Sequence, residues 1–279
     1  MTELRKLQLV QLKLLCEVDR ICRKHEIKYF LVAGTLLGAV RHKGFIPWDD
    51  DVDISMQYDD YVKFCSVCED ELEKSKYFLQ TMGNDAGYSY IFAKLRLENT
   101  LYIRKGQEHM RFHHGICIDI FPWYPVPEGE ATNRIYQFIV ARCKTIMWSP
   151  IGAISEKRLF YRSLYKMLAC IPAKIPYSII NFMVRCCSGR VLIDIGEPFY
   201  GNAKVSKRRL SHFTENAEQV RQRLQVNELT ELEFEGHLFY VPVNYDYYLK
   251  YMYGDYMQLP PKHERRGHHL AVVIDFGKH

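Results

Sequence analysis

The sequence of 279 residues lacks several features that would define whole classes of protein. No apolar run reaches the roughly 18 residues that a membrane-spanning helix requires. The positive charge is mild, +5 from 38 basic and 33 acidic side chains, and does not indicate a general nucleic-acid-binding protein. There are no repeats, no low-complexity segments and no clear flexible linker. A hydrophobic content of 48% is that of a globular protein with a full core.

Cysteine is present, but not in the pattern of a structural zinc site. One C-x-x-C pair, Cys65 and Cys68, has no second pair at zinc-finger distance and falls in a segment predicted to be helical, where both residues can pack on one face. The nine scattered cysteines indicate reduced, buried thiols, and the charged N-terminal residues do not resemble a signal peptide. We therefore expect a cytoplasmic protein, in peripheral contact at most with the inner face of the plasma membrane.

The most informative stretch, Gly34 to Ile54, ends in four aspartates within five residues: Asp49, Asp50, Asp51 and Asp53. Carboxylates this close repel one another, so gathering them is costly unless a cation neutralises them. The alternation from Asp51 to Ile54 predicts a half-buried strand with Asp51 and Asp53 on one face. Such a pair suits a hard cation such as Mg²⁺. The alternative is an acidic turn followed by a strand, without any ion.

The hydrophobic pattern predicts alternating helices and strands. Helices are expected over 3–25, 35–40, 59–72, 130–148, 156–170, 175–188 and 244–253, and strands over 29–33, 77–80, 88–97, 101–104 and 115–121, with a hairpin or strand pair within 234–243. We expect Pro122 to end the strand that carries Asp119, and Pro150, Pro172 and Pro176 to separate helices. A lone buried Asp119 needs a partner, and it could share a metal with Asp51 and Asp53.

Positive charge is concentrated in three places. The strand that leads into Gly34 and a helix N-terminus presents N–H groups to an anion, and Arg41, His42 and Lys43 follow it. The region 129–200 is apolar, aromatic and basic. It is either a helical module that rests on a membrane or a large acceptor, or a helical subdomain with a solvated basic face. The tail from Pro260 is basic and loop-like.

These motifs resemble the signature of the LicD family. The resemblance lies in residues 34–44 and 47–53, in the Asp-Ile-Phe-Pro of residues 115–122, and in paired residues between 241 and 261. It implies an α+β fold, a nucleotidyltransferase-like mixed sheet with helices, plus a helical insertion. We accordingly divide the chain into a catalytic core (1–128), a helical subdomain (129–200) and a C-terminal part (201–279) that completes the catalytic domain.

The resemblance also implies a reaction. Family members transfer phosphocholine from CDP-choline to a sugar hydroxyl of a cell-surface glycan, and fukutin-like relatives transfer ribitol phosphate from CDP-ribitol. Asp51, Asp53 and Asp119 would be the catalytic residues and the ligands of Mg²⁺ or Mn²⁺. The candidate donor-binding residues are Gly34, Thr35, Arg41, His42, Trp48, Asp49, Lys94, Arg96, Lys262, Arg266 and His268. The expected partners are a CDP-alcohol, foremost CDP-choline, and a glycan or lipid-linked glycan, without nucleic acid.

Two questions remain open at this level. A choline head group would favour an aromatic cage, and Trp48, Trp123 and Tyr124 lie beside the acidic strands, although residues of this kind more often simply belong to the core. The same carboxylates would also serve nucleotidyl transfer from an NTP, which releases pyrophosphate. A non-catalytic glycan- or membrane-binding scaffold is the third function considered. Such a scaffold should have lost motif carboxylates, and here all are present.

Overall fold

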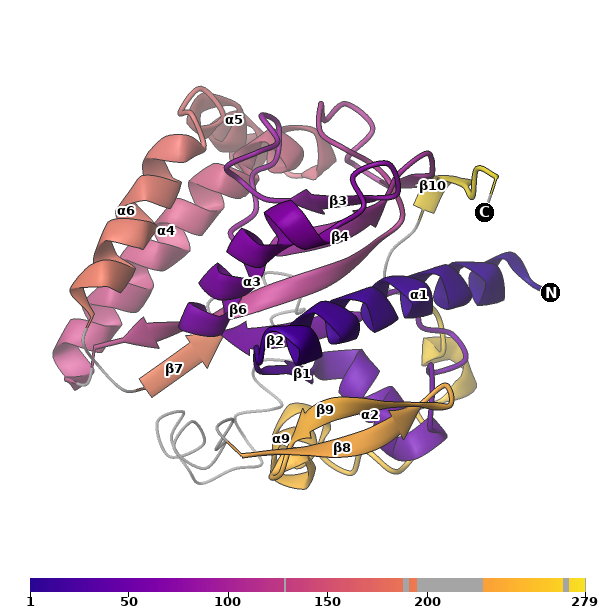
Figure 1. Cartoon of the computed structure of the whole chain (residues 1–279). Helices are drawn as coiled ribbons and strands as arrows, with labels where there is room; N and C mark the ends of the chain where they lie inside the picture. The colour runs from indigo at the N-terminus through magenta and orange to yellow at the C-terminus, as the bar shows by residue number, and fades with distance from the viewer. Residues whose placement is uncertain (128, 188–190, 195–227, 268–270, 279) are drawn as a thin grey trace.

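The structure is a computed structural model that describes residues 1–127, 129–187, 191–194, 228–267 and 271–278. Its centre is a mixed sheet with strand order β1-β2-β6-β4-β3, in which β7 also pairs with β6 (Figure 1). The strands are β1 Tyr29–Leu31, β2 Asp53–Gln57, β3 Tyr77–Gln80, β4 Ala93–Leu97, β6 Cys117–Val126 and β7 Val191–Asp194. Strands β2 and β6 are parallel, and the other pairs are antiparallel. The predicted α+β fold is confirmed.

Two helices pack against this sheet, α1 Glu3–Lys24 and α3 Tyr58–Glu71. Helix α1 begins after Thr2, whose hydroxyl accepts a hydrogen bond from the N–H of Arg5 (3.2 Å). Its apolar positions recur with helical spacing and are buried in the main core, as predicted. Burial of these apolar positions fixes the orientation of α1 across the sheet. The polar residues on the same face of the helix then point towards the aspartate segment.

The C-terminal part of the chain returns to the same core. A hairpin of β8 Leu229–Phe234 and β9 His237–Pro242 and helix α9 Tyr245–Tyr253 pack beside α2 Ala33–His42. The hairpin turn uses Glu235 and Gly236 with φ of 52° and 78°, the left-handed pair that a two-residue turn requires. The predicted hairpin is confirmed, and so is the predicted helix that ends at Gly254.

The basic tail is more ordered than the sequence indicates. It contains a short 3₁₀ helix, η1 Lys262–Glu264, and a strand, β10 Ala271–Asp275. Strand β10 pairs antiparallel with β5 Leu101–Arg104. We expected residues 88–97 and 101–104 to form a pair of strands. Instead β4, which covers only the last part of the first segment, pairs with β3 and β6.

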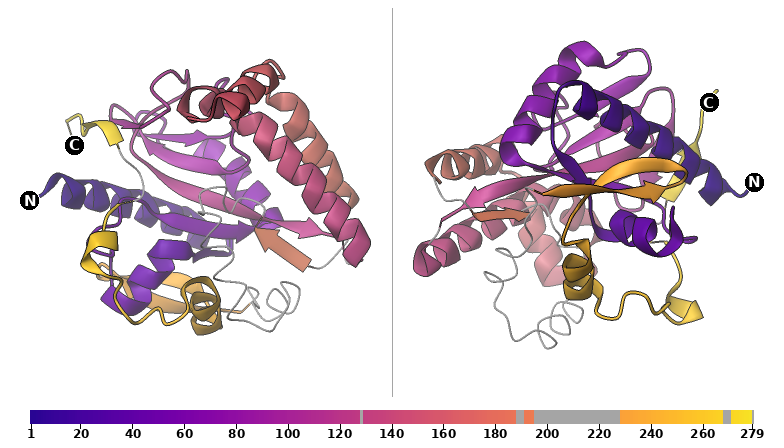
Figure 2. Two further views of the ribbon diagram at one scale, coloured as in Figure 1. Left: turned by 180° about the vertical axis from the view of Figure 1, so that it is seen from behind. Right: turned by 60° about the horizontal axis from the view of Figure 1, so that its bottom comes forward.

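Helices α4 Glu130–Ser155, α5 Leu159–Leu168 and α6 Lys174–Cys186 form the helical region, and α4 and α6 share a second apolar cluster with Tyr124 of β6. Figure 2 shows these helices grouped at one end of the sheet when the molecule is seen from behind. The boundaries 129–200 and 201–279 stay predictions, because residues 195–227 lie outside the described part of the chain, as does the basic segment 201–209.

Three predictions about proline are wrong. Pro176, expected to separate helices, lies in the first turn of α6. Helix α4 continues through Pro150, which has no N–H to donate to the carbonyl of Ile146. The hydroxyl of Ser149 donates to that carbonyl instead (2.6 Å). Strand β6 continues through Pro122, which lies between the last residue paired with β4, Ile120, and the first paired with β7, Trp123. At this gap in the pairing a missing N–H has little cost.

Candidate active site

The centre of the site is a row of polar side chains across three adjacent strands. Asp53 of β2 is in register with Asp119 of β6, and Asp119 is in register with Lys94 of β4. Residues in register on neighbouring strands point to the same face of a sheet, so these three side chains lie together. Lys94 is hydrogen-bonded to Asp119, and both side chains are buried. The buried Asp119 thus has a charged partner, as expected from the sequence, and this partner is Lys94.

The other aspartates approach this row in a loop. Residues 49–52 precede β2, so the prediction that Asp51 lies on the strand is wrong. The N–H of Asp53 donates to the hydroxyl of Thr35 (2.8 Å), and the N–H of Val32 donates to the carbonyl of Asp53 (3.2 Å). Because the Asp53 N–H is bonded to a side chain of α2, the pairing with β1 does not continue into Asp51.

Two glutamine side chains of helix α1 form hydrogen bonds with the backbone of the aspartate loop. The side-chain amide of Gln8 donates to the carbonyl of Asp49 (2.9 Å). The amide of Gln11 donates to the carbonyls of Asp50 (3.0 Å) and Cys117 (3.3 Å), so it links the loop to β6. Both glutamines are buried. Sequence analysis missed them, although two glutamines three positions apart within an apolar helix face are a usable signal of a buried polar contact.

The first turn of α2 lies against the same loop. We expected the helix to start at Thr35, but it starts at Ala33, so Gly34 and Thr35 belong to the helix N-terminus. A Cβ atom at position 34 would lie 2.6 Å from Oδ2 of Asp49. A larger residue at this position would therefore force the Asp49 carboxylate to move. A helix N-terminus stabilises negative charge, which favours this placement of a carboxylate.

Burial and mutual repulsion raise the pKa of two of the carboxylates. Burial and the charges of Asp51 and Asp50 raise the pKa of Asp49 well above its ordinary value. Burial, Asp51 and Asp119 do the same to the pKa of Asp53.

Asp119 behaves differently. Burial alone would raise its pKa, but the charges of Lys94 and Arg104 hold it below the ordinary value. The guanidinium of Arg104 lies 4.0 Å from the Asp119 carboxylate. Arg104 was not among the predicted site residues; it lies on β5, whose Tyr102 N–H donates to the carbonyl of His114 just before β6 (2.6 Å) and which also pairs with β10.

The donor set suits a hard divalent cation. Among the described residues, Asp49, Asp50 and Asp51 each offer one oxygen, and these oxygens lie within 4.8 Å of one another. This cluster shares Asp51 with the predicted set of Asp51, Asp53 and Asp119. Carboxylate oxygens are the ligands that Mg²⁺ and Mn²⁺ prefer. A cation would also relieve the repulsion that raises the pKa of Asp49 and Asp53, so the residues present fit such an ion.

Residues from both ends of the sequence surround the loop. Trp48 lies edge-on to His42, with 6.4 Å between ring centroids, and the guanidinium of Arg265 lies 5.6 Å from the Trp48 ring. A Cβ atom at Gly267 would lie 2.8 Å from Oδ2 of Asp50, so the tail touches the acidic loop. Arg41 is half-buried and donates to the carbonyl of Tyr256 (2.6 Å). The structure thus places His42, at the end of α2, and part of the basic tail near the acidic loop.

Some candidate residues lie elsewhere or outside the described chain. Arg96 is buried and donates to the side chain of Gln80 and the carbonyl of Gly115. Lys262 and Arg266 are exposed, and His268 is not among the described residues. Trp123 packs on Phe30 in the main core (5.2 Å between centroids), and Tyr124 belongs to the second apolar cluster. Of the three aromatic candidates, Trp48 is the one beside the acidic loop.

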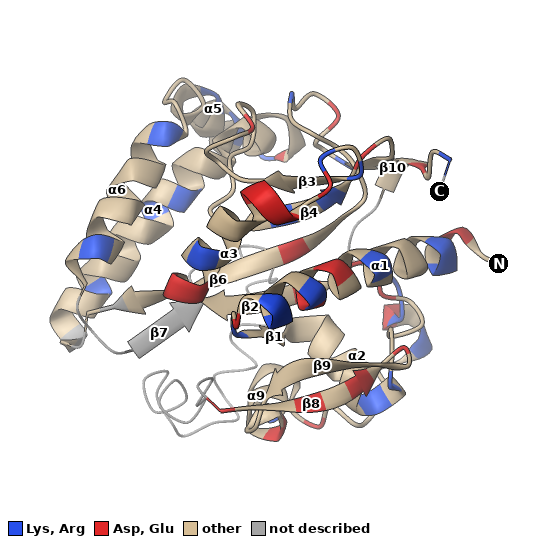
Figure 3. Ribbon diagram, viewed as in Figure 1, with Lys and Arg blue, Asp and Glu red and all other residues tan. Residues whose placement is uncertain are grey.

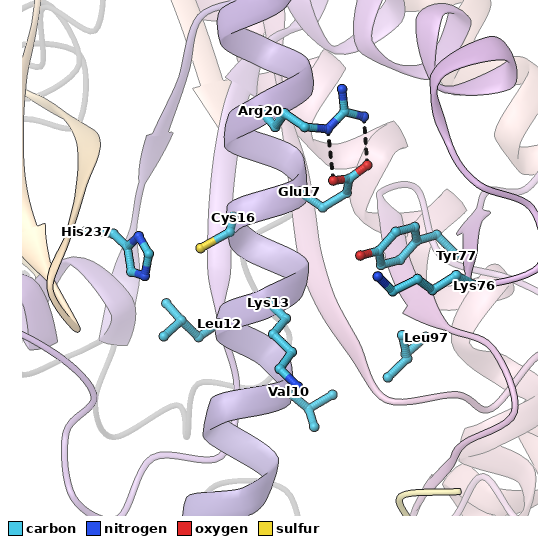
Figure 4. A pocket seen from close by; sticks show the side chains of 10 residues that line it. All are labelled: Val10, Leu12, Lys13, Cys16, Glu17, Arg20, Lys76, Tyr77, Leu97 and His237. Carbon is cyan, nitrogen blue, oxygen red and sulfur yellow. Dashed lines mark hydrogen bonds and ion pairs between the residues drawn. The ribbon is translucent and has the colours of Figure 1, made fainter. Parts of the chain in front are cut away.

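A separate hollow of about 650 Å³ lies along α1. Figure 4 shows Cys16 and His237 on one side of the helix and Tyr77 and Lys76 on the other, so the hollow straddles the helix. None of the aspartates of the site lines it. We therefore do not place the substrates there.

The mixed sheet, the DxD segment and the neighbouring Asp119 define a nucleotidyltransferase-like protein. The family model described as "LicD/FKTN/FKRP, nucleotidyltransferase domain" matches residues 26–142. The chain is 30% identical over 285 residues to the lipopolysaccharide cholinephosphotransferase LicD of Haemophilus influenzae, and the alignment covers 96% of each chain. The chain belongs to the LicD family.

Shorter matches agree with this assignment. The ribitol 5-phosphate transferase FKRP of Mus musculus is 30% identical over 104 residues, which are 36% of this chain and 17% of that protein. An uncharacterized protein of Rickettsia typhi is 44% identical over 55 residues, 20% of this chain and 18% of that protein.

Proposed function

We propose that this LicD-like phosphotransferase moves a phospho-alcohol group, foremost phosphocholine, from a CDP-alcohol to a sugar hydroxyl of a glycan or lipid-linked glycan. The observation that carries the proposal is the register of Asp53 and Asp119 on adjacent parallel strands beside the Asp49–Asp51 cluster. The similarity to a cholinephosphotransferase over 96% of the chain supports the choice of reaction.

The proposed cation is Mg²⁺ or Mn²⁺, held by Asp51, Asp53 and Asp119; Asp51 also belongs to the cluster with Asp49 and Asp50. When bound, it would neutralise the oxygens of the donor pyrophosphate. The protein's own cations lie next to the carboxylates: Lys94 is bonded to Asp119, and Arg104 is 4.0 Å from it. We assign these two groups to the phosphate oxygens of the donor, in addition to Arg41 and His42.

In the proposed reaction the acceptor hydroxyl attacks the phosphorus that bears the alcohol. The bond between that phosphorus and the bridging oxygen breaks, CMP leaves with the electron pair, and the hydroxyl proton passes to a carboxylate, for which Asp119 is our candidate. Trp48 is the proposed contact for a choline head group, because its ring lies beside the acidic loop.

Incubation of the protein and Mg²⁺ with a panel of CDP-alcohols and a glycan acceptor tests the proposal. We expect CMP and the phospho-alcohol ester of the glycan as products. Asp51→Asn and Asp53→Asn should each abolish transfer and weaken Mn²⁺ binding measured by calorimetry, whereas Asp59→Asn, an exposed aspartate of α3, should change neither. Release of pyrophosphate from an NTP, without CMP from any CDP-alcohol, would instead establish nucleotidyl transfer. Full transfer activity in both asparagine variants would refute the metal assignment.

A further inference from the structure

Helix α6 has an apolar stripe that no described part of the chain covers. Ile175, Ile179 and Phe182 are 53%, 42% and 69% exposed. They occupy positions i, i+4 and i+7, so they lie in one line along the helix. Ile180 and Val184 lie on a different face and are buried in the second apolar cluster. Helix α6 is therefore apolar on its packed side and also on a side that faces outward.

Helix α5, which like α6 packs on α4, carries a second set of exposed apolar side chains. It has no buried residue, and Leu159, Phe160 and Met167 are 69%, 75% and 64% exposed. Its other side rests on α4, where Tyr165 packs edge-on against Trp148 with 5.2 Å between ring centroids. A surface helix normally turns its apolar residues towards the core. Here three large apolar side chains point away from the contact that holds the helix in place.

Positive charge accompanies these apolar side chains and outweighs the one neighbouring acidic residue, Glu156, which pairs with Arg158 (3.0 Å). Residues 157–187 contain six basic residues and no acidic residue: Lys157, Arg158, Arg162, Lys166, Lys174 and Arg185. Figure 3 shows basic but no acidic residues along α6. The basic residues are interspersed with the exposed apolar ones in the sequence of both helices. Apolar side chains combined with cations match the acyl chains and phosphate groups of an anionic lipid surface.

The positive charge favours an anionic bilayer over a second copy of the chain as the partner of these helices. A symmetric contact between two copies would bring two sets of six cations together, with Glu156, the partner of Arg158, as the neighbouring acidic residue in each copy. Repulsion would oppose that contact, whereas lipid phosphates would neutralise the cations. Within the described residues no helix has the length and apolar character needed to cross a membrane.

We propose that the outward faces of α5 and α6 form a lipid-docking surface that binds an anionic bilayer. Phe160, Met167 and Phe182 enter the interface between head groups and acyl chains, while the six basic side chains contact lipid phosphates. This surface is independent of the aspartate site. It would bring the site to an acceptor carried on lipid, and that consequence alone rests on the proposed function.

Sedimentation of the whole protein with vesicles tests this proposal without any donor. We expect at least about tenfold stronger binding to vesicles of phosphatidylcholine with phosphatidylglycerol than to phosphatidylcholine alone, and weaker binding at high salt. The double variant Phe160→Ser/Phe182→Ser should lower binding at least about tenfold, because apolar insertion is lost. Arg162→Glu/Lys166→Glu should remove the preference for anionic lipid.

Matched controls are Leu238→Ser, at a side chain of β9 that is 56% exposed, and Lys74→Glu, at an exposed lysine; both should bind like the parent protein. Equal binding to both vesicle types, or no binding, would overturn the proposal. So would a dimer in analytical ultracentrifugation that the serine variant dissociates. CMP release with a soluble acceptor should be unchanged in the vesicle-binding variants. An active enzyme that ignores vesicles overturns only this inference, and a vesicle-binding protein without transferase activity overturns only the proposed function.

Discussion

Replacement of Gly34 by alanine tests whether the first turn of α2 sets the position of the Asp49 carboxylate. Elsewhere in a helix this change would stabilise the fold by about 0.5–1 kcal/mol, because alanine has less conformational freedom to lose. Here the new Cβ would lie 2.6 Å from Oδ2 of Asp49, well short of the 3.4 Å at which ordinary contact begins. The carboxylate must therefore move by roughly 0.8 Å, and misplacement by about 1 Å can lower a rate by about 10²-fold.

We expect Gly34→Ala to leave the free energy of unfolding nearly unchanged, because the gain from helix propensity is offset by the clash, and to lower CMP release by about 10²-fold. Urea denaturation and the transfer assay measure the two effects. In an Asp49→Ala background the clash partner is gone, so Gly34→Ala should stabilise the protein by about 0.5–1 kcal/mol. Ser66→Ala, at an exposed site in α3, controls for helix propensity. A fully active Gly34→Ala protein with a stabilised fold would refute the reasoning.

Three further predictions concern the same site. Gln11→Met removes the amide that serves Asp50 and Cys117 and should lower the free energy of unfolding by about 1–3 kcal/mol in urea denaturation; an unchanged stability would contradict the role of Gln11. Asp53→Asn should abolish transfer but raise the melting temperature of the metal-free protein. Burial and repulsion raise the folded-state pKa of Asp53, so the gain in melting temperature should be full above that pKa and vanish below the unfolded value of about 3.9. Calorimetry at several pH values measures this dependence. A gain in melting temperature that persists in acid would exclude the ionised Asp53 carboxylate as its cause. Trp48→Ala should reduce CMP release from CDP-choline by roughly 3- to 30-fold more than from CDP-ribitol, and equal losses would exclude a choline contact.

Local sequence pattern was a reliable guide wherever one segment sets its own conformation. The spacing of apolar residues located α1, and Gly236 and Gly254 marked the hairpin turn and the end of α9. Proline was a poorer guide. Pro150 stays inside a helix because Ser149 satisfies the carbonyl that proline leaves without a donor, and Pro122 stays inside a strand because its neighbours change there. Neither compensation can be recognised from the proline alone.

By itself the sequence determined that four aspartates crowd together after a glycine-threonine pair, that a fifth lies in an apolar strand, and that the chain resembles the LicD family. These properties are local, so they can be recognised without knowing which residues lie nearby in the folded protein. Only the tertiary structure decided which groups meet. Strand register sets Asp53 beside Asp119 and Lys94, and the position of β5 brings Arg104 to 4.0 Å from Asp119. Such contacts join residues far apart in the chain, and they depend on how hydrogen bonds align strands and how apolar faces pack.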